Sequence, residues 1–254
     1  MKALILYFSG TGNTAAVSRL IQISLEKNGI QTQMQSIEEP LESADCDFLV
    51  LGCPKYYEYP ALYFVDYLKN NLPAQAKTVP ALLFCTMSGT LETDFSGMEK
   101  ILSRKNYKVT VEKSFPYANN YMILRMFPST EPESLRNNVN AITQSIDPLI
   151  EKFLHGIEQK ETVKPWLSAL ERLTAVAFTK LMPRFQMKYS ATDDCISCNL
   201  CANNCPVHNI TMKNGKLDFG KDCIFCMRCI NCCPKNAILY NGQKCPQYTC
   251  KDKF

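Results

Sequence analysis

The strongest constraint on this chain is a cysteine pattern that occurs twice near its C-terminal end. Eleven of the 14 cysteines lie between Cys195 and Cys250. Eight of them form two copies of Cys-x2-Cys-x2-Cys-x3-Cys-Pro, offset by 28 residues at every position. These eight are Cys195, Cys198, Cys201, Cys205, Cys223, Cys226, Cys229 and Cys233. Residues 190–254 are too few to bury a self-sufficient core, so the pattern predicts a region held together by disulfides or metal.

Metal explains this pattern better than disulfides do. The chain begins Met1-Lys2-Ala3-Leu4 without an export signal, which predicts a reducing, cytoplasmic location. Zinc is usually held by two separated cysteine pairs. The run instead resembles bacterial two-cluster ferredoxins, in which three cysteines bind one 4Fe-4S cube and the fourth crosses to the other. The resemblance implies one cluster at Cys195, Cys198, Cys201 and Cys233, and another at Cys223, Cys226, Cys229 and Cys205.

Six cysteines remain outside this pattern. They are Cys46, Cys53, Cys85, Cys232, Cys245 and Cys250. The first three have spacings that match no metal site, so they are predicted to fill small apolar spaces. Cys232 stands where the first copy has Asn204, and is interpreted as a spare thiol. The last two could form a redox couple or a third metal site, but a tail without function is favoured because no second pair lies nearby.

The first 155 residues alternate between apolar runs and helical patterns. Apolar runs occupy residues 3–8, 48–52, 79–85 and 107–115, with a weaker strand pattern at 31–37. Helical patterns lie near residues 13–27, 60–70, 91–104 and 131–154. The alternation predicts five parallel strands covered on both faces, in a doubly wound α/β fold. Ligands of such folds bind at the carboxyl ends of the strands.

The turn after the first strand is a candidate phosphate site. It reads Ser9-Gly10-Thr11-Gly12-Asn13-Thr14, and such a loop directs N–H groups and a helix dipole at an anion. It lacks the Gly-Lys-Ser/Thr ending of a P-loop. Gly10, Gly12 and Ala15 also fit a dinucleotide fingerprint, with Glu38 as the ribose contact, and a plain turn is a third possibility. The three hydroxyls favour a terminal phosphate over a bridging pyrophosphate.

This loop resembles the phosphate loop of the flavodoxin family, which implies bound FMN. The resemblance also implies two loops that enclose the flavin ring, one after the third strand and one after the fourth. The first contains Pro54, Lys55, Tyr56 and Tyr57, and the second contains Thr86, Met87, Ser88 and Gly89. Either tyrosine could stack on the ring, with a surface turn as the alternative. Lys55 either lies beside the reduced ring or is solvated.

A segment between the two regions shows the pattern of an amphipathic helix. It runs from Lys164 to Met182, and its apolar positions are Trp166, Leu170, Leu173, Ala177 and Leu181. Three charges interrupt it, so it cannot span a bilayer. Packing between domains is favoured over binding to a membrane surface. The predicted organisation is a flavodoxin-like domain at residues 1–155, a linker helix at 156–189, and a small α+β two-cluster ferredoxin domain with its tail at 190–254.

The whole chain up to about Asn241 resembles the flavodoxin-ferredoxin fusion proteins of anaerobic microbes. The resemblance implies electron transfer between two 4Fe-4S clusters and FMN, with an external redox protein docking near the clusters. One alternative is a reductase of a small molecule such as a quinone, with residues 117–122 lining its pocket or forming an asparagine-stabilised loop. His155 and His208 suit structural roles, so no acid–base pair supports this enzyme. Another alternative is a redox sensor that acts through the linker.

The net charge gives no reason to expect a nucleic-acid partner. The formal charge of +4 divides into −2 for residues 1–155, +3 for residues 156–189 and +3 for residues 190–254. Two clusters with eight thiolates add about −4, and an FMN phosphate adds about −2. The loaded protein is therefore expected to be slightly acidic.

Overall fold

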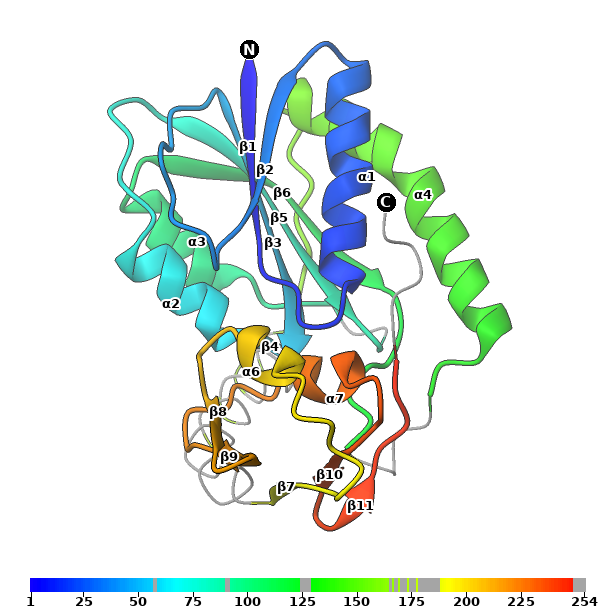
Figure 1. Ribbon diagram of the computed structural model, residues 1–254. Coiled ribbons are helices and arrows are strands. Elements are labelled where there is room, and N and C mark those ends of the chain that lie inside the picture. Colours follow the sequence, from blue (N-terminus) through cyan, green and yellow to red (C-terminus); the bar gives the residue numbers. More distant parts are fainter. Residues whose placement is uncertain are drawn as a thin grey trace.

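The computed structural model describes residues 1–56, 59–89, 92–123, 129–164 and 188–248, together with residues 166, 169, 173 and 177. Figure 1 shows an α/β layer structure above a smaller region, which lies beneath the carboxyl ends of the strands. The two parts are in contact, and most of the candidate site residues lie where they meet.

The larger part contains a parallel sheet of five main strands. These are β1 (Lys2–Tyr7), β2 (Gln31–Ser36), β3 (Phe48–Tyr56), β5 (Val79–Met87) and β6 (Tyr107–Pro116), in the order β2-β1-β3-β5-β6. A short β4 (Tyr59–Pro60) turns back antiparallel to β3. This order is the flavodoxin-like 2-1-3-4-5 arrangement. The predicted fold, including the weaker strand at residues 31–37, is therefore confirmed.

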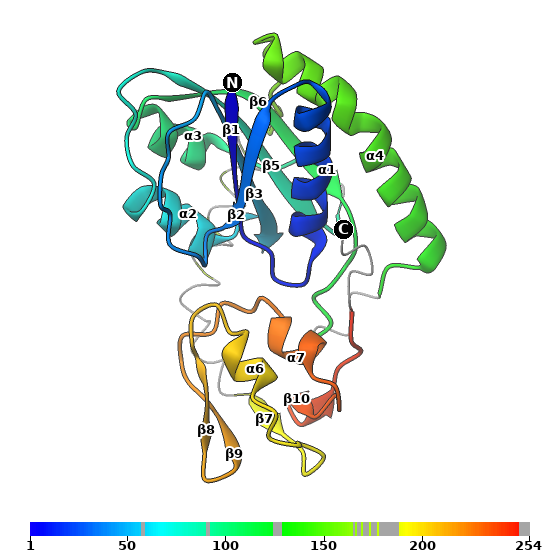
Figure 2. The same cartoon turned by 45° about the horizontal axis from the view of Figure 1, so that its top comes forward.

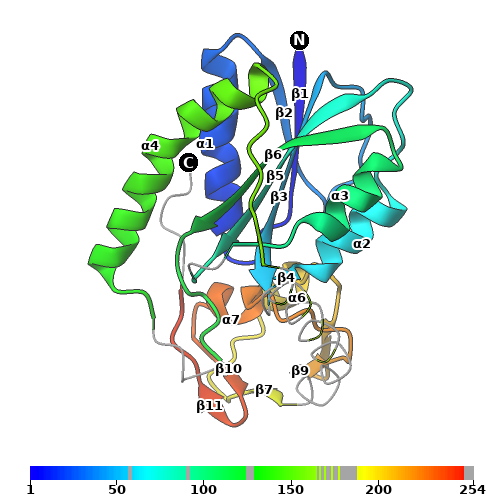
Figure 3. The ribbon, with the colours of Figure 1, turned by 180° about the vertical axis from the view of Figure 1, so that it is seen from behind.

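Four helices cover the two faces of the sheet. Helices α1 (Asn13–Lys27) and α4 (Pro132–Leu154) lie on one face, and α2 (Leu62–Asn70) and α3 (Ser96–Ser103) lie on the other (Figures 1 and 3). The helix expected over residues 91–104 begins only at Ser96, whose N–H donates to Asp94 Oδ1 at 3.0 Å. An acceptor before the helix thus satisfies one of its first N–H groups, and residues 92–95 stay non-helical.

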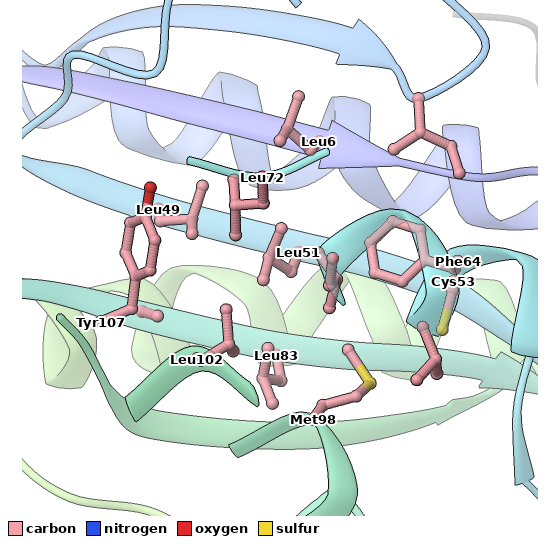
Figure 4. Close-up of a cluster of buried hydrophobic side chains, with 14 of the residues drawn as sticks. Leu6, Leu49, Leu51, Cys53, Phe64, Leu72, Leu83, Met98, Leu102 and Tyr107 are labelled. Carbon is pink, nitrogen blue, oxygen red and sulfur yellow. The ribbon is translucent and has the colours of Figure 1, made fainter. Parts of the chain in front are cut away.

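The strands separate two apolar layers because neighbouring side chains point to opposite faces. Leu49, Leu51 and Cys53 of β3 belong to the layer beneath α2 and α3, which Figure 4 shows. Val50 belongs to the layer beneath α1 and α4. Cys53 and Cys85 are fully buried with their sulfurs 3.6 Å apart. The prediction that these two thiols fill apolar space is confirmed.

The connection after α4 runs along the outer edge of β6. The Gln159 N–H donates to Thr110 O at 2.9 Å, and the Glu112 N–H donates to Gln159 O at 2.8 Å. Two residues later, the carboxylate of Glu161 accepts the N–H of Thr93 at 3.0 Å. The first part of the predicted linker thus covers an edge strand that would otherwise expose unpaired backbone groups.

A buried carboxyl lies under this connection. Glu112 Oε2 accepts the Glu161 N–H at 3.2 Å, whereas Oε1 has no hydrogen-bond partner among the described residues. Burial and the negative charges of nearby Glu99 and Glu161 raise the pKa of Glu112 from 4.5 to about 7, although Lys160 acts in the opposite direction. The folded chain therefore holds a proton that the unfolded chain has lost between these pH values, and stability falls as the pH rises through this window.

Replacing this carboxyl by a neutral amide, Glu112→Gln, is expected to remove that pH dependence. The free energy of unfolding should rise by about 2 kcal/mol at pH 8 and change little at pH 5. Denaturant unfolding at both pH values measures the difference. The exposed Glu42→Gln serves as control and should show no such contrast. An equal effect of Glu112→Gln at both pH values would show that the carboxyl ionises normally.

The smaller part is an α+β region, and its two halves repeat each other. Its elements are β7 (Tyr189–Ala191), α6 (Leu200–Asn203), β8 (Ile210–Lys213), β9 (Lys216–Phe219), α7 (Arg228–Cys232), β10 (Ile238–Tyr240) and β11 (Gln243–Lys244). β8 pairs with β9, and β10 pairs with both β7 and β11. The 28-residue offset recurs in the backbone, since φ is positive at Ser197 and Phe225 and again at Asn199 and Met227.

The predicted helix from Lys164 to Met182 lies largely outside the described residues. Its described members Trp166, Ala169, Leu173 and Ala177 are helical and exposed. Within the part of the chain that the structure covers, no helix has the length and apolar character needed to cross a membrane.

Candidate cofactor sites

The turn between β1 and α1 has the backbone geometry of an anion site. Gly12 adopts a φ of 110° at the start of α1, a conformation that favours glycine. Its N–H donates to Ser9 Oγ at 3.1 Å. The next three N–H groups, of Asn13, Thr14 and Ala15, meet no acceptor among the described residues. They lie at the positive end of the helix dipole and suit a phosphate.

The structure brings the loops after three strands together around this turn. Thr14 Oγ1 and Thr86 Oγ1 share a hydrogen bond of 2.8 Å, which joins the turn to the end of β5. Asn13 Nδ2 donates to Ala118 O at 3.3 Å, and Asn120 donates to Thr11. These hydrogen bonds thus bring residues predicted from separate segments together at one edge of the sheet.

The end of β3 supplies further candidate contacts, because this strand runs on to Tyr56 and includes the Pro54, Lys55 and Tyr56 that were predicted in a loop. Pro54 is buried, while Lys55 is half-buried and its Nζ donates to Glu92 O at 3.1 Å, linking the two loops predicted to hold the flavin ring. In the second predicted loop Met87 still belongs to β5 and is buried, whereas Ser88 and Gly89 follow the strand and are exposed. Tyr57, one of the two stacking candidates, lies outside the described residues.

Tyr56, the other stacking candidate, reaches the turn of residues 9–14, which we call the phosphate loop. A methyl group on Gly10 would lie 2.6 Å from Tyr56 Oη and 2.5 Å from the carbonyl oxygen of Cys226. Tyr56 Oη has no hydrogen-bond partner among the described residues, and burial raises the pKa of Tyr56 well above its usual value. Gly10 therefore lies where the phosphate loop, the end of β3 and the segment around Cys226 meet. Only a hydrogen atom fits at its Cα there.

Two cavities of the smaller part are each lined by four of the repeated cysteines. The first is lined by Cys205, Cys223, Cys226 and Cys229, and the second by Cys195, Cys198, Cys201 and Cys233. These are the two quartets that the ferredoxin resemblance implied, including the crossing of the fourth cysteine of each run. Cys232 lines neither of these cavities.

The cysteines of each cavity surround a space rather than a point. Among the described residues, no group of three or more possible ligands converges closely enough for a single metal ion. A cube differs from a single ion because its thiolates bind separate iron atoms. Burial raises the pKa of Cys226 to about 11, so this sulfur becomes a thiolate only when metal compensates its charge. The donor set fits clusters better than lone ions.

Backbone N–H groups donate to equivalent sulfurs in the two halves. The Asn209 N–H lies 3.2 Å from Cys205 Sγ, and the Ala237 N–H lies 3.3 Å from Cys233 Sγ. Such bonds stabilise negative charge on a ligand sulfur and tune the potential of a cluster. The repeat therefore extends from the cysteines to their surroundings.

The two halves differ sharply in exposure. Ile196 is 56% exposed and Leu200 is 42% exposed in the first half. Their counterparts in the second half, Ile224 and Arg228, face the larger part, and Cys226 belongs to its apolar layer. Figures 1 and 2 show α7, which follows Cys226, beneath the carboxyl ends of the strands. The first cavity therefore lies beside the phosphate loop, and we call it the proximal cavity; we call the other the distal cavity.

Sequence reasoning missed the residues that join the two parts. Arg228 forms an ion pair of 2.6 Å with Glu38, so the carboxylate considered for a ribose contact is occupied. Together with the strand order, this disfavours the dinucleotide interpretation. Tyr63 donates to Pro206 O at 3.1 Å. One sequence signal for Arg228 exists, because a charged residue stands where the first repeat has Leu200.

The C-terminal tail also bridges the two parts. Tyr248 Oη donates to Asn13 Oδ1 at 2.6 Å, and Gln247 Nε2 donates to Cys233 O at 2.6 Å. Cys245 is buried in the core of the smaller part, and Cys250 lies outside the described residues. The described part of the tail, up to Tyr248, thus contacts both parts of the chain.

Comparisons with known proteins find different relatives for the two parts of the chain. Residues 194–238 match a family model described as a 4Fe-4S dicluster domain. No curated protein matches the chain at a significant level. Solved structures similar to the larger part include a flavodoxin from the domain Archaea, at 16% identity over 61% of this chain and 100% of that chain, with a TM-score of 0.42.

Two other similar structures are also flavodoxins. The FMN-bound flavodoxin of Fusobacterium nucleatum is 15% identical over 62% of this chain and 99% of its own, with a TM-score of 0.44. The two-electron-reduced flavodoxin of Megasphaera elsdenii is 21% identical over 56% and 98%, with a TM-score of 0.40. The fold assignment rests on the strand order of the chain itself. The chain thus combines a flavodoxin-like fold with a region similar to 4Fe-4S dicluster domains.

Proposed function

We propose that this protein transfers electrons between two 4Fe-4S clusters and a bound FMN. The observation that carries the proposal is the contact between the proximal cavity and the phosphate loop, where Cys226 meets Gly10. Clusters carry single electrons and FMN accepts one or two, so their union in one chain couples the two kinds of redox chemistry. The eight repeated cysteines would hold the clusters.

The chain's own residues divide the work of binding FMN. The free N–H groups of residues 13–15 and the hydroxyls of Ser9 and Thr14 would bind the phosphate. Pro54, Lys55, Tyr56 and Tyr57 from one loop and Thr86, Met87, Ser88 and Gly89 from the other would enclose the ring. Apolar side chains such as Phe225 and Met227, both buried, would exclude water from the proximal cluster, which influences its potential.

An external redox protein is proposed to meet the distal cavity. Cys198 is exposed there, beside the exposed side chains of Ile196 and Leu200. The equivalent surface of the second half is already covered by the larger part of the same chain. The smaller part therefore offers one face to FMN and another to a partner.

The reductase alternative receives less support from the loop after β6. Tyr117, Ala118, Asn119 and Met122 are buried rather than arranged around an open pocket. The Tyr121 N–H donates to Asn119 Oδ1 at 2.9 Å, as in an asparagine-stabilised turn. These contacts favour a structural loop and hence an electron carrier.

Anaerobic analysis of the purified, cofactor-reconstituted protein tests the proposal. About eight iron atoms and one FMN per chain are expected, and the flavin spectrum should bleach once the clusters are reduced. A protein that binds no FMN, or only about four iron atoms, would contradict the two-cluster flavoprotein. Steady consumption of a quinone or an unsaturated acid would instead favour the reductase.

A further inference from the structure

The two cysteine repeats are equivalent in spacing but not in their surroundings, and Arg228 marks the difference. It lies between the cluster ligands Cys226 and Cys229, at the position where the first repeat has Leu200. Its side chain is only 19% exposed. A buried guanidinium is costly unless acceptors surround it, so its contacts show what it holds in place.

All five N–H donors of Arg228 are used by acceptors within the chain. Nε donates to Gly10 O at 3.1 Å, and Nη2 donates to Ser9 O at 2.7 Å. The carboxylate of Glu38 accepts from Nη1 at 2.7 Å and from Nη2 at 2.6 Å. Nη1 also donates to Asn204 O at 3.0 Å. The guanidinium thus joins the phosphate loop, the loop after β2 and the residue before Cys205.

These contacts distinguish Arg228 from a phosphate ligand. Its donors all point to protein acceptors, so no N–H remains for an anion. Its charge is balanced by Glu38 rather than by a cofactor. Arg228 instead fixes the position of two segments relative to each other. Its acceptors Ser9 and Gly10 directly precede the free N–H groups of the phosphate loop. On the other side, Cys205, Cys226 and Cys229 line the proximal cavity.

We propose that Arg228 is a positioning residue that holds the proximal cluster against the phosphate loop, so that this cluster, and not the distal one, exchanges electrons directly with FMN. This inference rests on the proposed function. Electron transfer slows steeply as the gap between cofactors widens, and the protein's task is to set that gap. The planar guanidinium of Arg228 fixes this gap through paired hydrogen bonds, which the single ammonium group of a lysine cannot reproduce.

Three variants of the cofactor-loaded chain test the inference. Arg228→Met removes every donor at similar length, and Arg228→Lys retains the charge but loses the paired hydrogen bonds. Glu38→Gln weakens the pair from the other side, far in sequence from the eight repeated cysteines. Lys213→Met serves as control, since Lys213 forms an exposed pair with Asp218 in the same region, away from the contact with the larger part.

Two readouts report position rather than turnover. Hydrogen exchange of residues 9–14 measures how firmly the phosphate loop is held, and the fluorescence lifetime of bound FMN reports quenching by a nearby cluster. Arg228→Met should raise the exchange rate at least tenfold and lengthen the lifetime severalfold, with iron and FMN contents unchanged. Glu38→Gln and Arg228→Lys should give smaller changes in the same direction, and Lys213→Met should give none.

The outcomes separate this inference from the proposed function. Wild-type protein without FMN or without iron would contradict the proposed function itself. Loaded Arg228→Met protein with unchanged exchange and lifetime would overturn the positioning role. If Arg228→Met loses its clusters, Glu38→Gln decides, because unchanged exchange and lifetime in that loaded variant would also overturn it. Equal changes in Lys213→Met would mean that loss of positive charge alone is responsible.

Discussion

Alanine in place of Gly10 is expected to separate the two cofactor regions and to weaken FMN binding at least tenfold. The added methyl group would lie 2.5 Å from the carbonyl oxygen of Cys226 and 2.6 Å from Tyr56 Oη. Both atoms belong to other segments of the chain, so the phosphate loop must move away from them. Overpacking of this kind typically costs about 1–3 kcal/mol. Fluorescence titration with FMN measures the affinity, and iron content should remain that of the wild type.

The matched control for this change is another crowded glycine. A methyl group on Gly52 would lie 2.2 Å from the Phe84 ring inside the sheet, away from the contact between the two parts. Gly52→Ala should therefore lower the free energy of unfolding without changing FMN affinity in the folded fraction. Unchanged FMN affinity in Gly10→Ala would contradict the close approach of Gly10 to Tyr56 and Cys226.

Serine in place of Cys226 should have the largest effect on electron transfer. It removes a proposed ligand of the proximal cluster, so iron should fall from about eight atoms per chain to about four or fewer. Reduction of FMN through the remaining cluster should slow at least a hundredfold, because the route then bypasses the contact at Gly10. Iron analysis and anaerobic stopped-flow absorption measure both effects.

Two cysteine variants make this result specific. Cys232→Ser removes a half-buried thiol that lines neither cavity, and it should keep all its iron. Cys198→Ser removes a proposed ligand of the distal cluster, so it should lose iron yet retain the proximal cluster and its exchange with FMN. Rapid FMN reduction in Cys226→Ser, or iron loss in Cys232→Ser, would contradict the ligand assignment.

Local patterns in the sequence predicted the five main strands and the four helices of the larger part. Strands β1, β3 and β5 are buried on both faces, so they appear as apolar runs. β2 lies at the edge and is partly exposed, which explains its weaker pattern. The start of α3 was predicted too early because the Asp94 carboxylate accepts the Ser96 N–H, and a pattern of apolar residues does not show such a contact.

In the candidate site, too, local motifs were predictable from the sequence, whereas contacts between distant segments were not. The phosphate loop lies within one strand–turn–helix unit, and the cysteine quartets recur with fixed spacing, so both were visible in the sequence. The contact between Arg228 and Glu38 joins residues 190 positions apart. Glu112 and Glu161 likewise come together only because the connection after α4 follows β6. Neither pair has a local signature.

By itself the sequence predicted a flavodoxin-like α/β fold, a candidate phosphate loop and two cysteine sets of identical spacing, because each depends on residues close together or regularly repeated. The crossing of the fourth cysteines was implied by the resemblance to two-cluster ferredoxins. Only the tertiary structure decided which of the two repeats lies against the proposed flavin site. That choice depends on packing between distant segments, namely Cys226 against Gly10 and Arg228 against Glu38. The spacing of the cysteines is identical in both halves, so it carries no information about this choice.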